Sequence, residues 1–319
     1  MHGKPRHEGL SRRAVLAAAV LVPGACVAER RGGFLPIATA EVDGVYFRIG
    51  NAIAERINLG YKGHGLRAAA QSSPGSFANV AALLRRRTAL GLIQSNDAWS
   101  LDAAHRGELR LLAALHAESF VLLARPEIGS PDALPGHPVA LGPPGSGHRT
   151  AMTALMAGRG WTPGDFTQTR EHTTRSSLAA LCAGVVDAVP LMIGHPAPAV
   201  GRVVDRCGAR PLALSDADRA AFGNHAPGFE PAVIPAGMYG TGTPAVPTVG
   251  TRVLLACHAG LSGAAAAAAV ASLLNGIEAL RAAHPVLRAV TARSLRPPVD
   301  GPVALHDGAR RAYAEAGVA

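Results

Sequence analysis

Residues 142–150 read GPPGSGHRT and lie between a short apolar run, Pro138 to Leu141, and a run with helical character, Ala151 to Ala157. This pattern predicts a strand, a glycine-rich turn and the start of a helix. The first N–H groups of a helix have no acceptor within the helix and lie at the positive end of its dipole. Such a turn can therefore bind an anion, which indicates a ligand loop at the carboxyl end of a strand.

The residue types in this loop exclude a nucleotide site. Gly142 and Gly147 have the spacing of a P-loop, but His148 and Arg149 occupy the positions that need lysine and serine or threonine. The groups that would hold phosphate and magnesium are missing. What remains suits a carboxylate or a neutral polar ligand, with Ser146 and the neighbouring amides as donors. A tight turn without a ligand is the alternative.

Residues 1–28 have the features of an export signal. Two arginines precede an apolar run, residues 14–22, that is too short to span a bilayer. The pattern SRRAVL resembles a twin-arginine signal, and the general secretory route is the alternative. We expect either cleavage after Ala28 or lipidation of Cys26 as an anchor. The sequence thus predicts a periplasmic or otherwise extracytoplasmic protein.

Charge and hydropathy exclude two further classes. The formal net charge is +9, but the basic residues are scattered, with Arg85 to Arg87 the only run of three. This distribution does not indicate a nucleic-acid partner. The apolar run from Ala264 to Leu280 comes closest to a membrane span, but Asn275 and Glu278 interrupt it. We predict a helix with a broad apolar face there.

No motif in the sequence indicates a metal, a cofactor or a catalytic residue. After the export signal three cysteines remain, Cys182, Cys207 and Cys257, and their spacing fits no metal site. One disulfide with one buried thiol, or three buried thiols, are equally consistent with it. The histidines are isolated, and neither Ser76 nor Ser146 lies in a G-x-S-x-G elbow.

Apolar strands alternate with helical runs along the rest of the chain. This order predicts an α/β protein with a largely parallel sheet and helices on both faces. Ligands of such sheets bind in loops at the carboxyl ends of strands. The predicted strands are 34–39, 66–70, 90–93, 110–117, 120–124, 138–141, 167–169 and 188–192, and the predicted helices are 46–57, 76–86, 97–105, 151–158 and 176–183.

Several of these loops carry, in order, the motifs of one family. The chain resembles the TAXI group of extracytoplasmic solute-binding proteins, the receptors of TRAP transporters. The resemblance runs from about residue 34 to the C-terminus. The matches are Thr39, Ala40, Gly44, Tyr46 and Gly50 in the first loop, Gly75, Ser76 and Asn79 in the second, Gln94, Ser95 and Asp97 in the third, Leu141 to Gly147, and then Asp187, Gly194, Pro196, Ile234 to Gly237, Tyr239, Ala283 to Pro285, His306 to Gly308 and Glu315 to Gly317.

The resemblance implies a periplasmic binding protein-like fold, with two α/β lobes, a hinge and a ligand cleft between the lobes. Strands would cross near residues 120–125 and 231–255, so that residues 32–122 with about 232–319 form lobe 1 and residues 123–231 form lobe 2. The implied function is a receptor and not an enzyme. It would bind a small carboxylate-containing solute, such as a dicarboxylate, a 2-oxo acid or a glutamate-like amino acid, and deliver it as a monomer to a TRAP permease.

The resemblance also implies a set of ligand-binding residues that face one another across the cleft. Other roles are open to some of them: Asn79 can cap its own helix, Gln94 can pair with backbone, and Tyr46 can belong to the core. The expected set is Thr39, Ala40, Glu41, Tyr46, Ser73, Ser76, Asn79, Gln94, Ser95, Asp97, Gly145, Ser146, Gly147, His148, Gly237 and Tyr239.

Departures from the family pattern bear on the solute, and one of them is Arg48 in place of a frequent proline. Glu41 and Asp43 are carboxylates where relatives carry neutral residues; Glu41 either meets a ligand ammonium or points to solvent. His148 replaces a threonine, and we expect a group that titrates near neutrality, so that affinity depends on pH. Two other functions stay open: a binding protein that serves a sensor kinase, and an enzyme in which Ser146 with His148, or Glu41 with Asp43, performs acid–base work. The sequence leaves the solute itself open.

Overall fold

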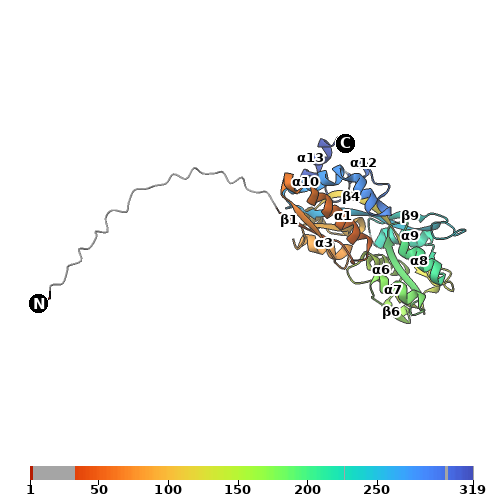
Figure 1. The fold of residues 1–319 in the computed structure, drawn as a ribbon. Helices are drawn as coiled ribbons and strands as arrows, with labels where there is room; N and C mark the ends of the chain where they lie inside the picture. Colours follow the sequence, from red (N-terminus) through yellow and green to blue (C-terminus); the bar gives the residue numbers. More distant parts are fainter. Residues whose placement is uncertain (3–32, 226, 299–300, 319) are drawn as a thin grey trace. The chain divides into compact units, whose positions relative to one another are not determined.

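A mixed sheet of ten strands organises the chain (Figure 1). The structure is a computed structural model, and it describes residues 1–2, 33–225, 227–298 and 301–318. Residues 31–319 form one unit. Apart from residues 1–2, the predicted export signal and its lipidation site at Cys26 lie outside the described residues.

The sheet has the strand order β2-β1-β3-β10-β4-β7-β5-β6, with β8 paired to β4 and β9 paired to β10. Parallel pairs form at its two ends, where β1 joins β2 and β3, and β5 joins β6 and β7. The strands are β1 Phe34–Ala38, β2 Arg67–Gln71, β3 Leu90–Gln94, β4 Leu109–Ala124, β5 Pro138–Ala140, β6 Gln168–Arg170, β7 Ala188–Ile193, β8 Arg210–Leu212, β9 Glu230–Ile234 and β10 Val246–His258.

The prediction of a largely parallel sheet is wrong for the centre of the sheet. There β10 is antiparallel to β3, β4 and β9, and β4 is antiparallel to β7 and β8. The two strands predicted over residues 110–117 and 120–124 are one continuous strand, β4. Glu118 and Ser119 read as a polar break in the sequence, but both are buried inside this strand.

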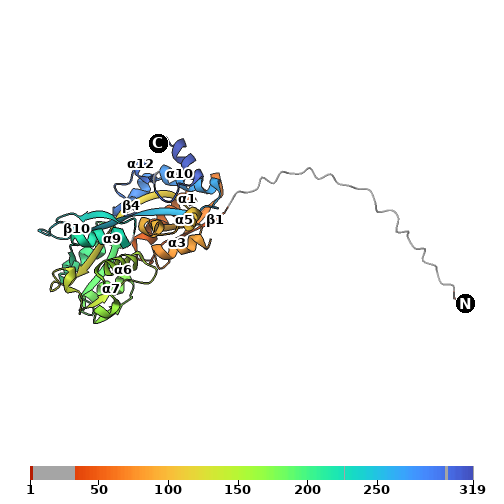
Figure 2. The ribbon, with the colours of Figure 1, turned by 180° about the vertical axis from the view of Figure 1, so that it is seen from behind.

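Helices pack on both faces of the sheet, and α10 lies beside α1 although the two are distant in sequence (Figures 1 and 2). Asp102 accepts a hydrogen bond from the N–H of His105 and so begins a new helix, which explains why the predicted helix 97–105 is divided. The helices are α1 Val45–Leu59, α2 Tyr61–His64, α3 Ser76–Leu84, α4 Ser95–Trp99, α5 Ala103–Glu108, α6 Gly147–Arg159, α7 Thr174–Cys182, α8 Pro198–Cys207, α9 Asp216–His225, α10 Gly263–Asn275, α11 Ile277–Ala283, α12 Ala292–Leu295 and α13 Asp307–Glu315, with 3-10 turns η1 Pro131–Ala133, η2 Pro163–Asp165 and η3 Pro285–Leu287.

The buried apolar residues form clusters that divide along β4 and β10. Two clusters draw their buried members from residues 35–115 and 253–313. Two others draw theirs from residues 120–249. The lobe boundaries near residues 122 and 232 stay a prediction.

The predicted helix over residues 264–280 is a pair, α10 and α11, bent by 75°. Among the described residues, no single helix has the length and hydropathy to cross a membrane, although this bent pair meets that criterion by length and composition when taken together. Ala265, Ala269 and Leu273 of α10 are buried in an apolar cluster of the sheet.

A disulfide joins Cys182, at the end of α7, to Cys207, at the end of α8. Cys257 is a free and buried thiol. Of the two cysteine arrangements left open by the sequence, the structure therefore has one bridge and one buried thiol.

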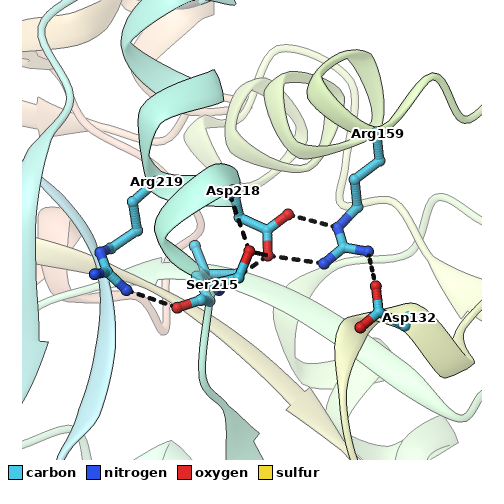
Figure 3. A network of polar contacts seen from close by, with 6 residues as sticks. Asp132, Arg159, Ser215, Asp218 and Arg219 are labelled. Atoms are coloured by element: carbon cyan, nitrogen blue, oxygen red, sulfur yellow. Dashed lines mark hydrogen bonds and ion pairs between the residues drawn. The ribbon is translucent and has the colours of Figure 1, made fainter.

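An ion-pair network fixes the end of α6 (Figure 3). Arg159 Nη2 donates to Asp218 Oδ2 over 2.7 Å, and its Nη1 donates to Asp132 Oδ1 over 2.5 Å. Asp218 Oδ2 also accepts from the backbone N–H and the hydroxyl of Ser215. These bonds connect η1, α6 and α9, and so hold the helix whose first turn carries the glycine-rich loop.

Candidate ligand-binding site

A cavity of about 820 Å³ lies among the first turns of four helices. Residues 44–46 of α1, 75–76 of α3, 146–148 of α6 and 174–175 of α7 contribute to its wall, counting each helix with its N-cap. Each helix brings the positive end of its dipole and N–H groups without acceptors inside the helix. These helix ends favour an anion, although at α7 the carboxylate of Glu41 already accepts from the N–H of Thr174.

A buried hydrogen-bonded cluster forms the inner end of the cavity. Glu118 Oε2 accepts from the hydroxyl of Tyr46 over 3.1 Å and from Nε2 of Gln94 over 2.7 Å. Burial, followed by the charge of Glu118, raises the pKa of Tyr46 well above its ordinary value, so the phenol keeps its proton. Gln94 Oε1 is buried and has no partner among the described residues. Together these groups offer a carboxylate and an amide oxygen at the base of the cavity.

The glycine-rich loop starts a helix, as predicted. Ser146 is the N-cap of α6: its Oγ accepts from the N–H of Arg149 and donates to the carbonyl of Pro143. The N–H groups of Gly147 and His148 remain for a ligand, because the first turn offers them no acceptor. A Cβ on Gly147 would come within 2.1 Å of Gln94 Oε1, so a larger residue here would displace the side chain of Gln94.

His148 is a neutral side chain that connects two elements. Its Nδ1 accepts from the N–H of Met192 over 2.8 Å, which leaves the proton on Nε2, 3.1 Å from the hydroxyl of Thr174. Burial lowers the pKa of His148 to about 4. The expectation that this residue titrates near neutrality is therefore wrong, and His148 gives no reason for ligand affinity to change between about pH 5.5 and 8.

Glu41 and Asp43 connect the loop before α1 to the start of α7. Both carboxylate oxygens of Glu41 accept from the N–H of Thr174, at 3.1 and 3.2 Å. Asp43 forms an ion pair of 2.5 Å with Arg175. Glu41 is thus neither directed at a ligand alone nor a bystander in solvent, because it lines the cavity while it holds the first turn of α7.

Asn79 and Ser73, two other predicted site residues, do not line the cavity and bond to one another and to the backbone. Asn79, fully buried, donates to the carbonyls of Thr39 and Leu92 at 2.6 and 2.7 Å, and it accepts from the hydroxyl of Ser73. Ligand contact stays a prediction for the whole set. Of the set, Ala40, Glu41, Tyr46, Ser76, Gln94, Ser146, Gly147 and His148 line the cavity, and Thr39, Ser73, Asn79, Ser95, Asp97, Gly145, Gly237 and Tyr239 do not.

Ser95, Tyr239 and Asp97 also do not line the cavity, and each is bonded or buried elsewhere in the protein. Ser95 shares a hydrogen bond of 2.7 Å with Thr251 on β10. The hydroxyl of Tyr239 accepts from the N–H of Ala197 over 2.9 Å. Asp97 is buried, and burial raises its pKa to about 6.

Sequence reasoning missed the acid at the base of the cavity and two of the cations in its wall, Arg202 and Arg206. Glu118 lies in the middle of β4, and a lone acid in a long apolar run was the signal that could have found it. Arg48, Arg202 and Arg206 also line the cavity. Arg202 and Arg206 are one helical turn apart on α8, a spacing that the sequence shows.

Several solved structures of known proteins are similar to this chain. A protein from Bordetella bronchiseptica RB50 has a TM-score of 0.58 and 16% identity, covering 90% of this chain and 99% of that chain. PhnD1 from Prochlorococcus marinus, in complex with methylphosphonate, has a TM-score of 0.54 and 10% identity, with the same coverage of 90% and 99%. SsuA, the periplasmic aliphatic sulphonate binding protein of Escherichia coli, has a TM-score of 0.45 and 17% identity, over 89% and 93%.

The fold is thus of the periplasmic binding protein-like α/β class, which confirms the fold class predicted from the sequence. Residues 37–317 match the model of the NMT1-like family, and the chain belongs to this family.

Proposed function

We propose that the protein is an extracytoplasmic receptor that binds a small organic acid in this cavity and delivers it to a membrane transporter. The observation that carries this proposal is the convergence of four helix N-termini on one cavity of about 820 Å³. The cavity lies within a fold of the periplasmic binding protein class. A pocket of this size with a few placed polar groups is typical of a small-molecule site.

The charges around the cavity support an anionic solute. Arg48, Arg202 and Arg206 line it and form no ion pair with any acidic side chain in the part of the chain that the structure describes. Arg175 is paired with Asp43. Guanidinium groups and helix N-termini both favour carboxylates, so the cations supplement the dipoles.

Glu118 narrows the class of solute. Its Oε1 is 3.8 Å from His116 Nε2, too far for a hydrogen bond, so this oxygen keeps capacity to accept from a ligand. A carboxylate placed beside Glu118 without a donor would be repelled. Among dicarboxylates, 2-oxo acids and amino acids, we therefore favour a glutamate-like amino acid, whose ammonium donates to Glu118 while its carboxylate meets the helix N-termini.

The partner and the location follow from the same proposal. The resemblance to TAXI receptors supports a TRAP permease as the membrane partner of a periplasmic monomer. An enzyme on this scaffold is less well supported, because the hydroxyl of Ser146 and Nδ1 of His148 are already engaged with Pro143 and Met192.

Titration calorimetry of the purified protein with glutamate, 2-oxoglutarate and glutarate tests the proposal. We expect glutamate to bind most tightly, and Glu118→Gln to weaken glutamate binding about tenfold while glutarate binding stays level or improves. Asp205→Asn on α8 is the matched control, because Asp205 is exposed and does not line the cavity. Absence of binding by all three acids would refute the receptor; equal binding that Glu118→Gln leaves unchanged would refute the amino-acid preference.

A further inference from the structure

The cavity continues from the helix N-termini along a groove between α7 and α8. On α7 its wall follows Thr174, Leu178 and Cys182, and on α8 it follows Ala199, Arg202 and Arg206. These positions recur at intervals of three or four residues, so each helix presents one face to the groove. From Thr174 to Cys182 that face is about 12 Å long at 1.5 Å per residue.

The polarity of the groove changes along its length. Its middle is apolar, with Leu178 of α7, Val203 of α8 and Met192 of β7 in the wall. On α8 it carries two arginines, Arg202 and Arg206, which are exposed and one turn apart. Cβ atoms at this spacing are about 6 Å apart, so both guanidinium groups can reach a single anionic group.

The disulfide fixes the far end of this groove. Cys182 is itself part of the wall, and its partner Cys207 directly follows Arg206. The last turns of α7 and α8 are therefore held together by a covalent bond. Arg206 is thereby anchored at the end of α8, away from the cluster around Glu118 at the inner end.

We propose that the groove between α7 and α8 is a second subsite that selects an elongated solute with an anionic group at each end. Arg202 and Arg206 hold the outer anion, and an unbranched apolar spacer, longer than that of glutamate, packs on Leu178 and Val203. This inference rests on the proposed receptor function. The cavity volume of about 820 Å³ lies within the range of pockets for drug-sized ligands, about 300–1,000 Å³, and a five-carbon acid would leave much of it unfilled.

A ligand series separates length from charge. Glutamate, 2-aminoadipate and 2-aminosuberate share the amino-acid end and differ in spacer length, whereas 2-aminooctanoate has the length of 2-aminosuberate but no terminal carboxylate. By calorimetry we expect affinity to rise along the series. We also expect 2-aminosuberate to bind about tenfold more tightly than 2-aminooctanoate, as an arginine–carboxylate contact provides.

The variant Arg202→Gln/Arg206→Gln should remove that tenfold difference, and it should weaken glutamate binding less than 2-aminosuberate binding. The control Arg288→Gln/Arg293→Gln removes the same charge from exposed positions that do not line the cavity, and it should keep the difference. The second subsite is refuted, and the receptor function is not, if glutamate binds but neither a longer spacer nor a terminal carboxylate raises the affinity. The same holds if the double variant still binds 2-aminosuberate more tightly than 2-aminooctanoate. If none of the acids binds the wild type, the receptor function fails and the subsite fails with it.

Discussion

At the inner end of the cavity Tyr46 and Gln94 both donate hydrogen bonds to Glu118, whereas along the outer groove Arg202 and Arg206 have no acidic partner within the described residues. The inner groups are buried and held in place before any ligand arrives, so they can select by geometry. The outer cations are exposed on a helix face and select by charge. Selectivity at the inner end should therefore tolerate salt, while selectivity at the outer end should weaken with it.

Removing the disulfide should cause the largest change, both in the free energy of unfolding and in the difference between the inner end and the outer groove. The bridge closes a sequence separation of 25 residues, so Cys182→Ser/Cys207→Ser should lower the free energy of unfolding by about 3.5 kcal/mol. Chemical denaturation of both proteins measures this loss, and reduction of the wild type should reproduce it. In the variant the outer preference for a long diacid should decline more than glutamate binding. An equal decline of both would show that the disulfide does not act on the groove in particular.

His148, beside the inner end, should make stability depend on pH. Its folded-state pKa is lowered to about 4, while an unfolded histidine titrates near 6.5, so the unfolded chain binds more protons between these values. The free energy of unfolding should therefore fall as pH drops from about 6.5 to 4, by about 3 kcal/mol from this residue. Denaturation curves of His148→Asn should show a smaller fall. His195, whose pKa is also lowered to about 4, contributes equally to both proteins, and parallel pH profiles would contradict the assignment.

Substitution of Asn79 tests whether a residue that does not line the cavity affects the free energy of unfolding and not the contact with a ligand. Asn79→Ala removes the hydrogen bonds to the carbonyls of Thr39 and Leu92, of which the Thr39 carbonyl keeps a donor in the hydroxyl of Ser73, and should cost about 2 kcal/mol of unfolding free energy. Glutamate affinity of the folded variant should change less than in Ser76→Ala, because Ser76 lines the cavity. Thermal unfolding and calorimetry on the two variants decide it. A large loss of affinity with unchanged stability would place Asn79 at the ligand.

The ion pair between Asp43 and Arg175 should have the smallest effect. Both side chains are substantially exposed, 42% and 78%, and exposed pairs contribute about 0.5 kcal/mol. A double-mutant cycle with Asp43→Asn and Arg175→Gln, in low and high salt, measures the coupling. A coupling that persists unchanged in high salt would show that this contact is stronger than its exposure implies.

The sequence predicted most strands and helices because their apolar periods are clear. Phe34–Ala38, Leu90–Gln94 and Ala188–Ile193 appear nearly where their apolar runs place them. The predicted helices near residues 46–57 and 151–158 likewise correspond to α1 and α6. The antiparallel centre was not predictable in this way, because period and composition specify a strand but not the direction of its neighbour.

The residues of the candidate site likewise fall into those that the sequence predicted and those that it did not. Loop motifs placed Tyr46, Gln94 and Gly147 at the cavity, since loops that open helices meet at one edge of a sheet. Glu118 escaped because it comes from the middle of a strand and not from such a loop. Arg206 escaped because it becomes part of the wall only through the packing of α8 against α7, a contact between elements that no local pattern encodes.

β4 passes from one pair of apolar clusters to the other between Leu115 and Phe120, and Glu118 lies within that passage. If the parts on either side rotate against each other, β4 and its neighbour β10 are where the chain must twist, and β4 supplies the acid at the base of the cavity. A solute that donates to Glu118 would then act on the pivot itself. Occupancy would then reach a partner without a relay of side chains, because Glu118 and the twisting segment would be one piece of backbone.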